Sequence, residues 1–257
     1  MNGLTVSNLS FSYGSRAILR DVTFDALQPG QLTALIGPNA AGKSTLFKSI
    51  AGLLKPSTGQ ITLGGLDLAT LSAQARLKQI CFMPQFFAAN AALTVFDVVM
   101  MAQKQLRGWR VNSADTAAVA HALSAGGIGH LAEAYVSELS GGQSQMVSVV
   151  QALVRQSDVY LFDEPTSALD LRHQLDVLGR IRAAIRDRDA IGMVALHDLN
   201  LAARYADHLI LIGNGVIQTQ GTPEEVLNSP KIAEVYDVDV ELLVGPRKDL
   251  LVHAYAS

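Results

Sequence analysis

A glycine-rich segment near the start of the chain carries the residue types that bind a polyphosphate. Its sequence is GPNAAGKST, residues 37–45, which satisfies the pattern G-x-x-x-x-G-K-[ST]. Phosphate oxygens need backbone N–H donors that approach closely, the positive end of a helix dipole and an ammonium group. We therefore expect Lys43 to contact the outer phosphates and the Ser44 hydroxyl to bind Mg²⁺. The residues assigned to this site are Gly37, Pro38, Asn39, Ala40, Ala41, Gly42, Lys43, Ser44 and Thr45.

Two adjacent acids, Asp163 and Glu164, end an apolar segment much later in the chain, VYLFDE at 159–164. A phosphate-binding loop of this kind needs an acid on a neighbouring strand, which holds Mg²⁺ through a water molecule. A carboxylate just beyond the strand end can accept a proton from the water that attacks the γ-phosphate. We therefore assign Asp163 to the magnesium site and Glu164 to general-base catalysis.

A second small-residue segment, LSGGQ at 139–143, precedes the helical pattern SQMVSVVQAL. A serine and two glycines at a helix N-terminus form another cradle for an anion. One chain rarely needs two triphosphate cradles for a single nucleotide. We therefore expect the second cradle to complete the nucleotide site of another subunit.

The hydrophobic pattern predicts the elements that position these segments. The apolar run 31–36 predicts a strand before the glycine-rich loop, and Leu46 and Ile50 belong to a helical pattern after it. Strand, loop and helix in this order are the context that a phosphate site needs. Segments 158–162 and 190–196, with a helix predicted over 169–186 between them, are typical of a β-α-β unit.

Other segments predict how the chain is divided. Segments 4–11 and 18–24 alternate apolar and polar residues and predict an antiparallel hairpin. Alanine, valine and methionine recur at helical spacing over 88–155, which predicts a helical subdomain. We therefore expect a nucleotide-binding core over 1–87 and 156–221, a helical subdomain over 88–155 that carries LSGGQ, and a C-terminal tail over 222–257.

The composition excludes several classes of protein. The chain has 257 residues, of which 49% are hydrophobic and 17% charged, so it can bury a large core and is neither disordered nor collagen-like. A net charge of −3 gives no general attraction to nucleic acid. The one cysteine, Cys81, permits no internal disulfide and fits the cytoplasm. No apolar run reaches the ~20 residues that span a bilayer, and no secretory signal is evident, so we expect a chain that neither crosses the membrane nor is exported.

Six segments, in one order along the chain, resemble those of the nucleotide-binding subunits of ATP-binding cassette (ABC) transporters. They are the P-loop GPNAAGKST, the glutamine loop FMPQ ending at Gln85, the signature LSGGQ, the Walker B segment VYLFDE, the D-loop SALD ending at Asp170, and the switch histidine His197. The resemblance implies the α/β class: a P-loop NTPase core with a mixed, largely parallel sheet, an N-terminal antiparallel β subdomain and an inserted α-helical subdomain.

The resemblance also implies a role for each matching position. Tyr13 would stack on adenine, Gln85 would join Ser44 and Asp163 around Mg²⁺, and His197 would contact the γ-phosphate. Lys43, Glu164 and His197 would form the catalytic set. In a dimer that holds two ATP molecules, ATP would also be contacted from the opposite copy by Ser140, Gly141, Gly142, Gln143 and Asp170.

Two features depart from the family pattern. The fourth P-loop position is Ala40 where the family has glycine, and a Cβ there costs on the order of 1 kcal/mol if φ is positive. After the signature the family usually has arginines, whereas this chain has Ser144 and Met146. Either change could lower nucleotide affinity or the rate of hydrolysis, so a degenerate, nucleotide-binding regulator stays an alternative.

The subfamily pattern around HDLNLAARYADHLILIGNGVIQTQGTPEEVL resembles that of importers for iron–siderophore complexes, haem and cobalamin. It implies three partners: a second copy of the chain, transmembrane permease subunits and, indirectly, an extracytoplasmic binding protein. Nucleic acid is not among the expected partners. The expected location is the cytoplasmic face of the inner membrane. The alternatives are a soluble ABC ATPase without a permease, and a subunit of an exporter or of another importer class.

One expectation concerns the permease contact. The helical subdomain would offer a groove for a short permease helix. Its apolar lining could include Phe86, Phe87, Val98 and Met101, although plain core packing would explain the same residues.

Overall fold

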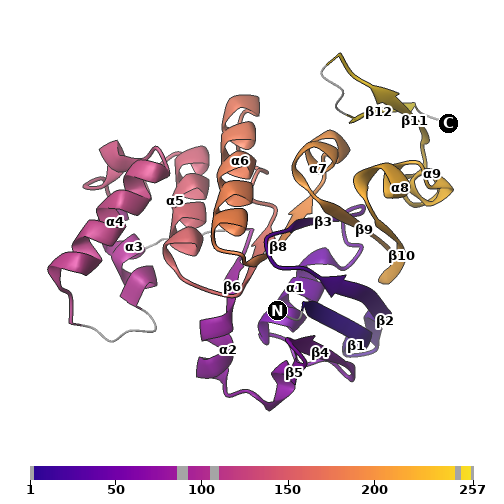
Figure 1. Ribbon diagram of the computed structural model, residues 1–257, viewed down its shortest axis with the longest axis horizontal. Coiled ribbons are helices and arrows are strands. Elements are labelled where there is room, and N and C mark those ends of the chain that lie inside the picture. The colour runs from indigo at the N-terminus through magenta and orange to yellow at the C-terminus, as the bar shows by residue number, and fades with distance from the viewer. Residues whose placement is uncertain (1–2, 86–91, 105–109, 247–249, 256–257) are drawn as a thin grey trace.

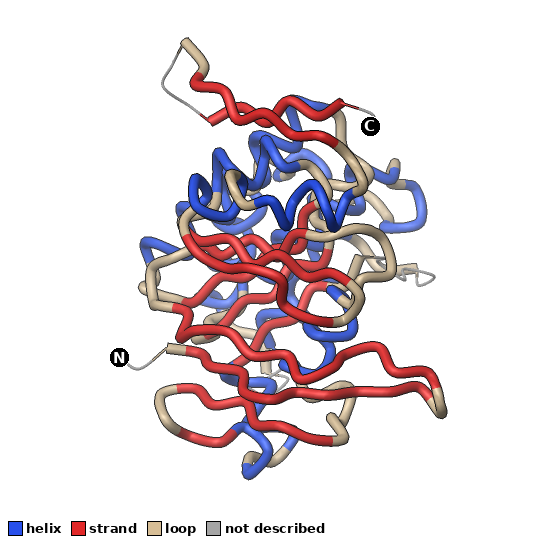
Figure 2. Tube along the Cα trace, turned by 90° about the vertical axis from the view of Figure 1, so that its right-hand side faces the viewer, coloured by secondary structure: helices blue, strands red, loops and turns tan. Residues whose placement is uncertain are grey.

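The computed structural model describes residues 3–85, 92–104, 110–246 and 250–255. Within these residues the strands form three sheets, and most of the helices lie on one side of the largest sheet (Figure 1). Figure 2 shows the N-terminal strands at the bottom, the strands of the largest sheet above them and the C-terminal hairpin at the top. Phe86 and Phe87 lie outside the described residues.

The central sheet has six strands in the order β10-β9-β3-β8-β7-β6. Strands β9, β3, β8, β7 and β6 are parallel, and β10 pairs antiparallel with β9 at the edge. The inner strands are continuous apolar runs because helices or a second sheet cover both of their faces. The strand bounds are β3 Leu32–Ile36, β6 Ile80–Met83, β7 Val159–Asp163, β8 Ile191–Leu196, β9 His208–Gly213 and β10 Val216–Gly221.

The N-terminal sheet is antiparallel, with the order β2-β1-β4-β5. The predicted hairpin is present and is longer than the sequence pattern indicated, because bulges let β1 and β2 continue pairing as far as the turn after Tyr13. The bounds are β1 Leu4–Tyr13, β2 Arg16–Leu27, β4 Thr58–Leu63 and β5 Leu66–Asp67.

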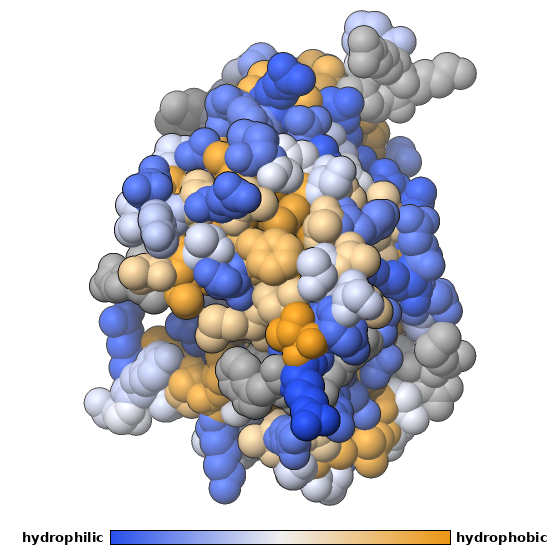
Figure 3. Space-filling model, turned by 90° about the vertical axis from the view of Figure 1, so that its left-hand side faces the viewer, coloured by the Kyte–Doolittle hydropathy of each residue, from blue (hydrophilic) through white to orange (hydrophobic). Residues whose placement is uncertain are grey.

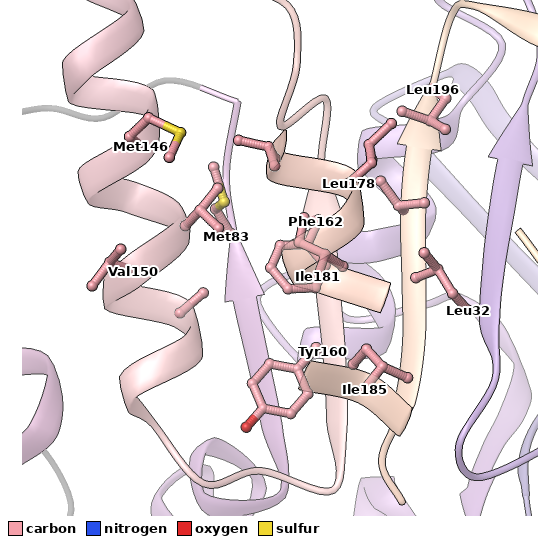
Figure 4. Close-up of a cluster of buried hydrophobic side chains, with 14 of the residues drawn as sticks. Leu32, Met83, Met146, Val150, Tyr160, Phe162, Leu178, Ile181, Ile185 and Leu196 are labelled. Carbon is pink, nitrogen blue, oxygen red and sulfur yellow. The ribbon is translucent and has the colours of Figure 1, made fainter. Parts of the chain in front are cut away.

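Alternate residues of the central strands enter two different hydrophobic cores. Tyr160 and Phe162 of β7 belong to the core that includes Val150 of α5 and Ile181 of α6, as Figure 4 shows. Leu161, between them, belongs to the core formed with α1 and the N-terminal sheet. This alternation holds the sheet between two apolar layers.

The helices begin and end at signals in the sequence. Helix α6 starts at Leu171 rather than at the predicted residue 169, because Asp170 is its N-cap and accepts a hydrogen bond from the backbone N–H of His173 at 2.9 Å. The bounds are α1 Lys43–Ala51, α2 Ala73–Gln79, α3 Val95–Lys104, α4 Ser113–Ala125, α5 Gly141–Val154, α6 Leu171–Asp187, α7 Leu199–Tyr205, α8 Pro223–Leu227 and α9 Pro230–Tyr236, with short 3₁₀ turns at Leu68–Thr70, Gly129–Leu131 and Val136–Glu138. None of the helices in the described part of the chain is long and apolar enough to cross a membrane.

Helices α3, α4 and α5 pack on one another between β6 and β7 along the chain. A buried ion pair joins α3 to α4, with Lys104 Nζ 2.8 Å from Asp115 Oδ2. Asp115 also completes a capping box with Asn112 at the start of α4. Helix α5 then returns the chain to the central sheet, and it carries the LSGGQ segment at its N-terminus.

The last part of the chain forms a hairpin of β11 (Asp239–Val244) and β12 (Leu250–Tyr255). The hairpin packs on α7, where Asn200 bonds to both backbone groups of Val252. Side chains on its outer side stay exposed, among them the paired Leu243 and Leu251.

Candidate functional site

The loop 37–42 between β3 and α1 is shaped by glycines. A Cβ on Gly37 would lie 2.1 Å from the carbonyl oxygen of Ile212, so only glycine fits there. Gly42, with φ 110°, is the N-cap of α1 and provides no side-chain cap. The first N–H groups of α1 therefore remain available to an anion, and the helix dipole adds to their attraction.

Lys43 is buried within this loop. Its Nζ donates hydrogen bonds to the carbonyl oxygens of Gly37 at 2.6 Å and Pro38 at 3.0 Å. Burial lowers the pKa of Lys43, and the nearby carboxylates of Glu164 and Asp163 oppose that effect. The ammonium group is thus held by the same loop whose N–H groups would face phosphate oxygens.

Ser44 and Asp163 form the second part of the site. The Ser44 hydroxyl donates to Asp163 Oδ1 at 3.0 Å, although the two residues lie 119 positions apart in the chain. Burial raises the pKa of Asp163, and the hydrogen bond from Ser44 opposes this shift. A hydroxyl and a carboxylate are hard oxygen ligands, which fit Mg²⁺ bound through one or two protein groups, phosphates and water.

Three side chains meet just beyond the carboxyl ends of three neighbouring parallel strands. Gln85 follows β6, Glu164 follows β7 and His197 follows β8. Gln85 Nε2 donates to Glu164 Oε2 at 2.6 Å, and His197 Nε2 lies close to Glu164 Oε1. In open α/β sheets, ligands bind at this carboxyl edge.

The backbone of Glu164 has an unusual conformation, with φ 53°. A non-glycine residue in this left-handed region costs roughly 1–2 kcal/mol, so the surroundings must hold it there. Its carbonyl oxygen accepts bonds from the Ser167 N–H at 3.3 Å, from the Ser167 hydroxyl at 3.2 Å and from Gln145 Nε2 at 3.2 Å. The sequence pattern does not identify Gln145 as a functional residue. It shows a polar side chain among the apolar positions of α5, but it does not indicate which residue that side chain contacts.

The LSGGQ segment lies in another part of the molecule. Ser140 caps α5 in a capping box with Gln143: Ser140 Oγ accepts from Gln143 N at 3.3 Å, and Gln143 Oε1 accepts from Ser140 N at 2.9 Å. A cleft of about 690 Å³ is lined by Ser140, Gly142 and Gln143 together with Asp170. No residue of 37–45 is among the described residues that line this cleft. The two predicted cradles are therefore separate within one copy of the chain.

Most of the remaining predicted residues lie at the surface. Tyr13, at the end of β1, is 52% exposed, and its ring makes an edge-to-face contact with Phe11, with ring centroids 4.8 Å apart. Its free face is open to a planar ligand. Asp170 is exposed, and the hydrogen bonds from His173 lower its pKa. Val98 is buried in the helical core, whereas Met101 is 45% exposed, so only Met101 of these two offers an apolar surface.

We predict that Ala40→Gly raises the free energy of unfolding. Ala40 has φ 61°, a conformation that disfavours a Cβ. Removing the Cβ relieves this strain in the folded state, and the gain exceeds the cost of a more flexible unfolded chain by up to about 1 kcal/mol. The matched control is Ala41→Gly, next in the loop, where φ is not positive and a buried methyl group is lost. Thermal unfolding of the purified variants checks this: Ala41→Gly lowers the midpoint, and a similar fall for Ala40→Gly would contradict the prediction.

Comparison with known proteins gives one consistent result. Residues 19–167 match the family described as ABC transporter. The chain is 37% identical to the achromobactin transport ATP-binding protein of Dickeya dadantii over 96% of this chain and 92% of that protein. It is 38% identical to a hemin import ATP-binding protein of Thermobifida fusca over 95% of this chain and 85% of that protein. A solved dimeric ATP-binding cassette with ADP and phosphate bound has the same fold, with a TM-score of 0.78 at 23% identity, over 86% of this chain and 98% of that one.

Proposed function

Since this chain belongs to the ABC transporter family and is one of its ATP-hydrolysing subunits, we propose that it powers an importer for an iron–siderophore complex, haem or cobalamin. The observation that carries the proposal is the meeting of Gln85, Glu164 and His197 at the strand ends, beside the paired Ser44 and Asp163. The proposed substrate class rests on relatives whose names include achromobactin transport, hemin import and cobalamin import.

The P-loop binds the nucleotide in this proposal. The N–H groups at the start of α1 and the ammonium group of Lys43 face the outer phosphates, and the exposed ring of Tyr13 stacks on the base. Ser44, Gln85 and, through water, Asp163 would hold Mg²⁺. When bound, the ion neutralises charge on the β- and γ-phosphate oxygens.

Glu164 acts as the general base. It accepts a proton from the attacking water, which requires one carboxylate oxygen to turn from its present partner. We assign that partner as His197, because its imidazole would then be available to the γ-phosphate while Gln85 keeps its bond to Oε2. Most of the catalysis is positioning of the water and stabilisation of charge on the phosphates.

A second copy of the chain completes each site. The cradle at Ser140 does not share a cleft with the P-loop of its own copy, so the ATP it contacts is held by the P-loop of the other copy. The residues proposed to act across the dimer are Ser140, Gly141, Gly142, Gln143 and Asp170. The dimeric cassette of the same fold, with ADP and phosphate bound, supports this arrangement.

The helical end of the molecule is the proposed contact with a membrane permease. Figure 3 shows the side of the molecule where α4 lies in Figure 1, with apolar side chains gathered near the middle of this face. Met101 on α3 and Val111 before α4 are large apolar side chains of the helical subdomain that stay exposed. Binding there would place the chain at the cytoplasmic face of the membrane.

Uptake by cells tests the importer function. In a strain that lacks this chain but keeps its permease, the wild-type chain restores uptake of one of three labelled compounds offered separately: a ferric siderophore, haemin or cyanocobalamin. The Glu164→Gln chain at equal abundance does not. If the wild type hydrolyses ATP in vitro but restores none of the three, the ATPase assignment stands and the substrate class is wrong.

A further inference from the structure

The main-chain carbonyl of Glu164 connects the general base to α5, the helix that carries the LSGGQ segment at its start. The carbonyl accepts two bonds from Ser167, which closes the turn after β7, and one from Gln145 Nε2 at 3.2 Å. The Ser167 bonds come from within the same turn and move with it. The Gln145 bond comes from α5, a different element, and ties the turn to that helix.

The side chain of Gln145 is buried between α5 and the turn after β7. It is only 5% exposed, although a glutamine amide is strongly polar, and it lies two residues after the LSGGQ segment on the first turns of α5. The same face of the helix is packed closely against the turn, since a Cβ on Gly142 would lie 3.4 Å from Leu169. The first turns of α5 are therefore in direct contact with the turn that follows Glu164.

We infer that Gln145 is a positioning residue that couples the LSGGQ cradle to the general base of its own copy. The inference rests on the proposed function, in which the cradle of one copy contacts the ATP of the other. Gln145 holds the carbonyl of Glu164 while φ at that residue stays left-handed, so the direction of the carboxylate depends on where α5 lies. ATP seated on the cradle would thus adjust Glu164, which acts on the second ATP.

The consequence is communication between the two nucleotide sites. With the link intact, hydrolysis at each site responds to occupancy of the other, and the rate rises with ATP concentration more steeply than for independent sites. Without the hydrogen bond from Gln145, the fold and both binding sites remain, but the Glu164 carboxylate is less well positioned to accept a proton from the attacking water.

The experiment compares Gln145→Met with Gln151→Met in the full-length chain. Methionine keeps the volume of glutamine and removes the amide donor. Gln151 is the matched control, because it lies on the same helix and its Nε2 donates to another backbone carbonyl, that of Val98, at 3.1 Å. We expect Gln145→Met to lower kcat about tenfold and the Hill coefficient towards 1, with KM changed less than about twofold, whereas Gln151→Met stays within about twofold of wild type.

A double-mutant cycle separates positioning from a general structural effect. In a Glu164→Gln background, adding Gln145→Met should change the single-turnover rate of hydrolysis by less than about twofold. The carboxylate that Gln145 positions is already absent from that background. A full tenfold loss in that background, equal effects of the two methionine variants, or wild-type kinetics for Gln145→Met would each overturn the inference and leave the proposed function intact. A wild-type chain that fails to hydrolyse ATP would instead overturn the proposed function and this inference with it.

Discussion

Glu164→Gln is expected to lower ATP turnover by at least about a hundredfold while ATP binding is retained. The amide has the shape of the carboxylate and can still accept the bond from Gln85, so the site keeps its geometry. It cannot accept a proton from the attacking water, and the general base is worth roughly 10²–10⁴ in rate. Because the ATP held between the two copies is then not hydrolysed, the variant should accumulate as a dimer with ATP bound.

The measurement combines steady-state hydrolysis with light scattering in ATP and Mg²⁺. Glu133→Gln, an exposed acid in the helical region, is the matched charge control and should turn over and dissociate like the wild type. Turnover of the Glu164→Gln chain within tenfold of wild type would show that another group accepts the proton, and the role assigned to Glu164 would be wrong.

Lys43→Met is expected to weaken ATP binding by roughly 30- to 1,000-fold. The ammonium group makes charge-assisted bonds within the loop and would transfer them to the outer phosphates, and bonds to charged groups of this kind contribute about 2–4 kcal/mol in total. The fold should not suffer equally, because methionine removes a buried charge whose desolvation already lowers the pKa of Lys43.

Titration calorimetry with ATP and Mg²⁺ gives the affinity, and thermal unfolding without nucleotide reports the fold. Lys55→Met, at an exposed position after α1, is the control for loss of one positive charge and should bind ATP like the wild type. If Lys43→Met binds ATP within about threefold of wild type, or loses affinity only because it unfolds, the phosphate contact assigned to Lys43 is contradicted.

The hydrophobic pattern and the short motifs determined the local structure. The apolar run before GPNAAGKST and the helix after it follow from residue types within a few positions, because the loop demands glycines and a helix start. The caps at Ser140 and Asp170 are local in the same way, since each side chain bonds to an N–H three residues on. Such features need no knowledge of the rest of the fold.

Only the tertiary structure decided which distant residues meet. Gln85 and Glu164 lie 79 positions apart and bond because β6 and β7 are neighbours in the sheet, and hydrophobic periodicity does not encode strand order. From the sequence, a Cβ at Ala40 is costly only if φ is positive there. The structure shows that φ is 61°. The bond from Gln145 to Glu164 depends on how α5 packs beside the end of β7, a contact between elements, and for that reason no spacing along the chain could have predicted it.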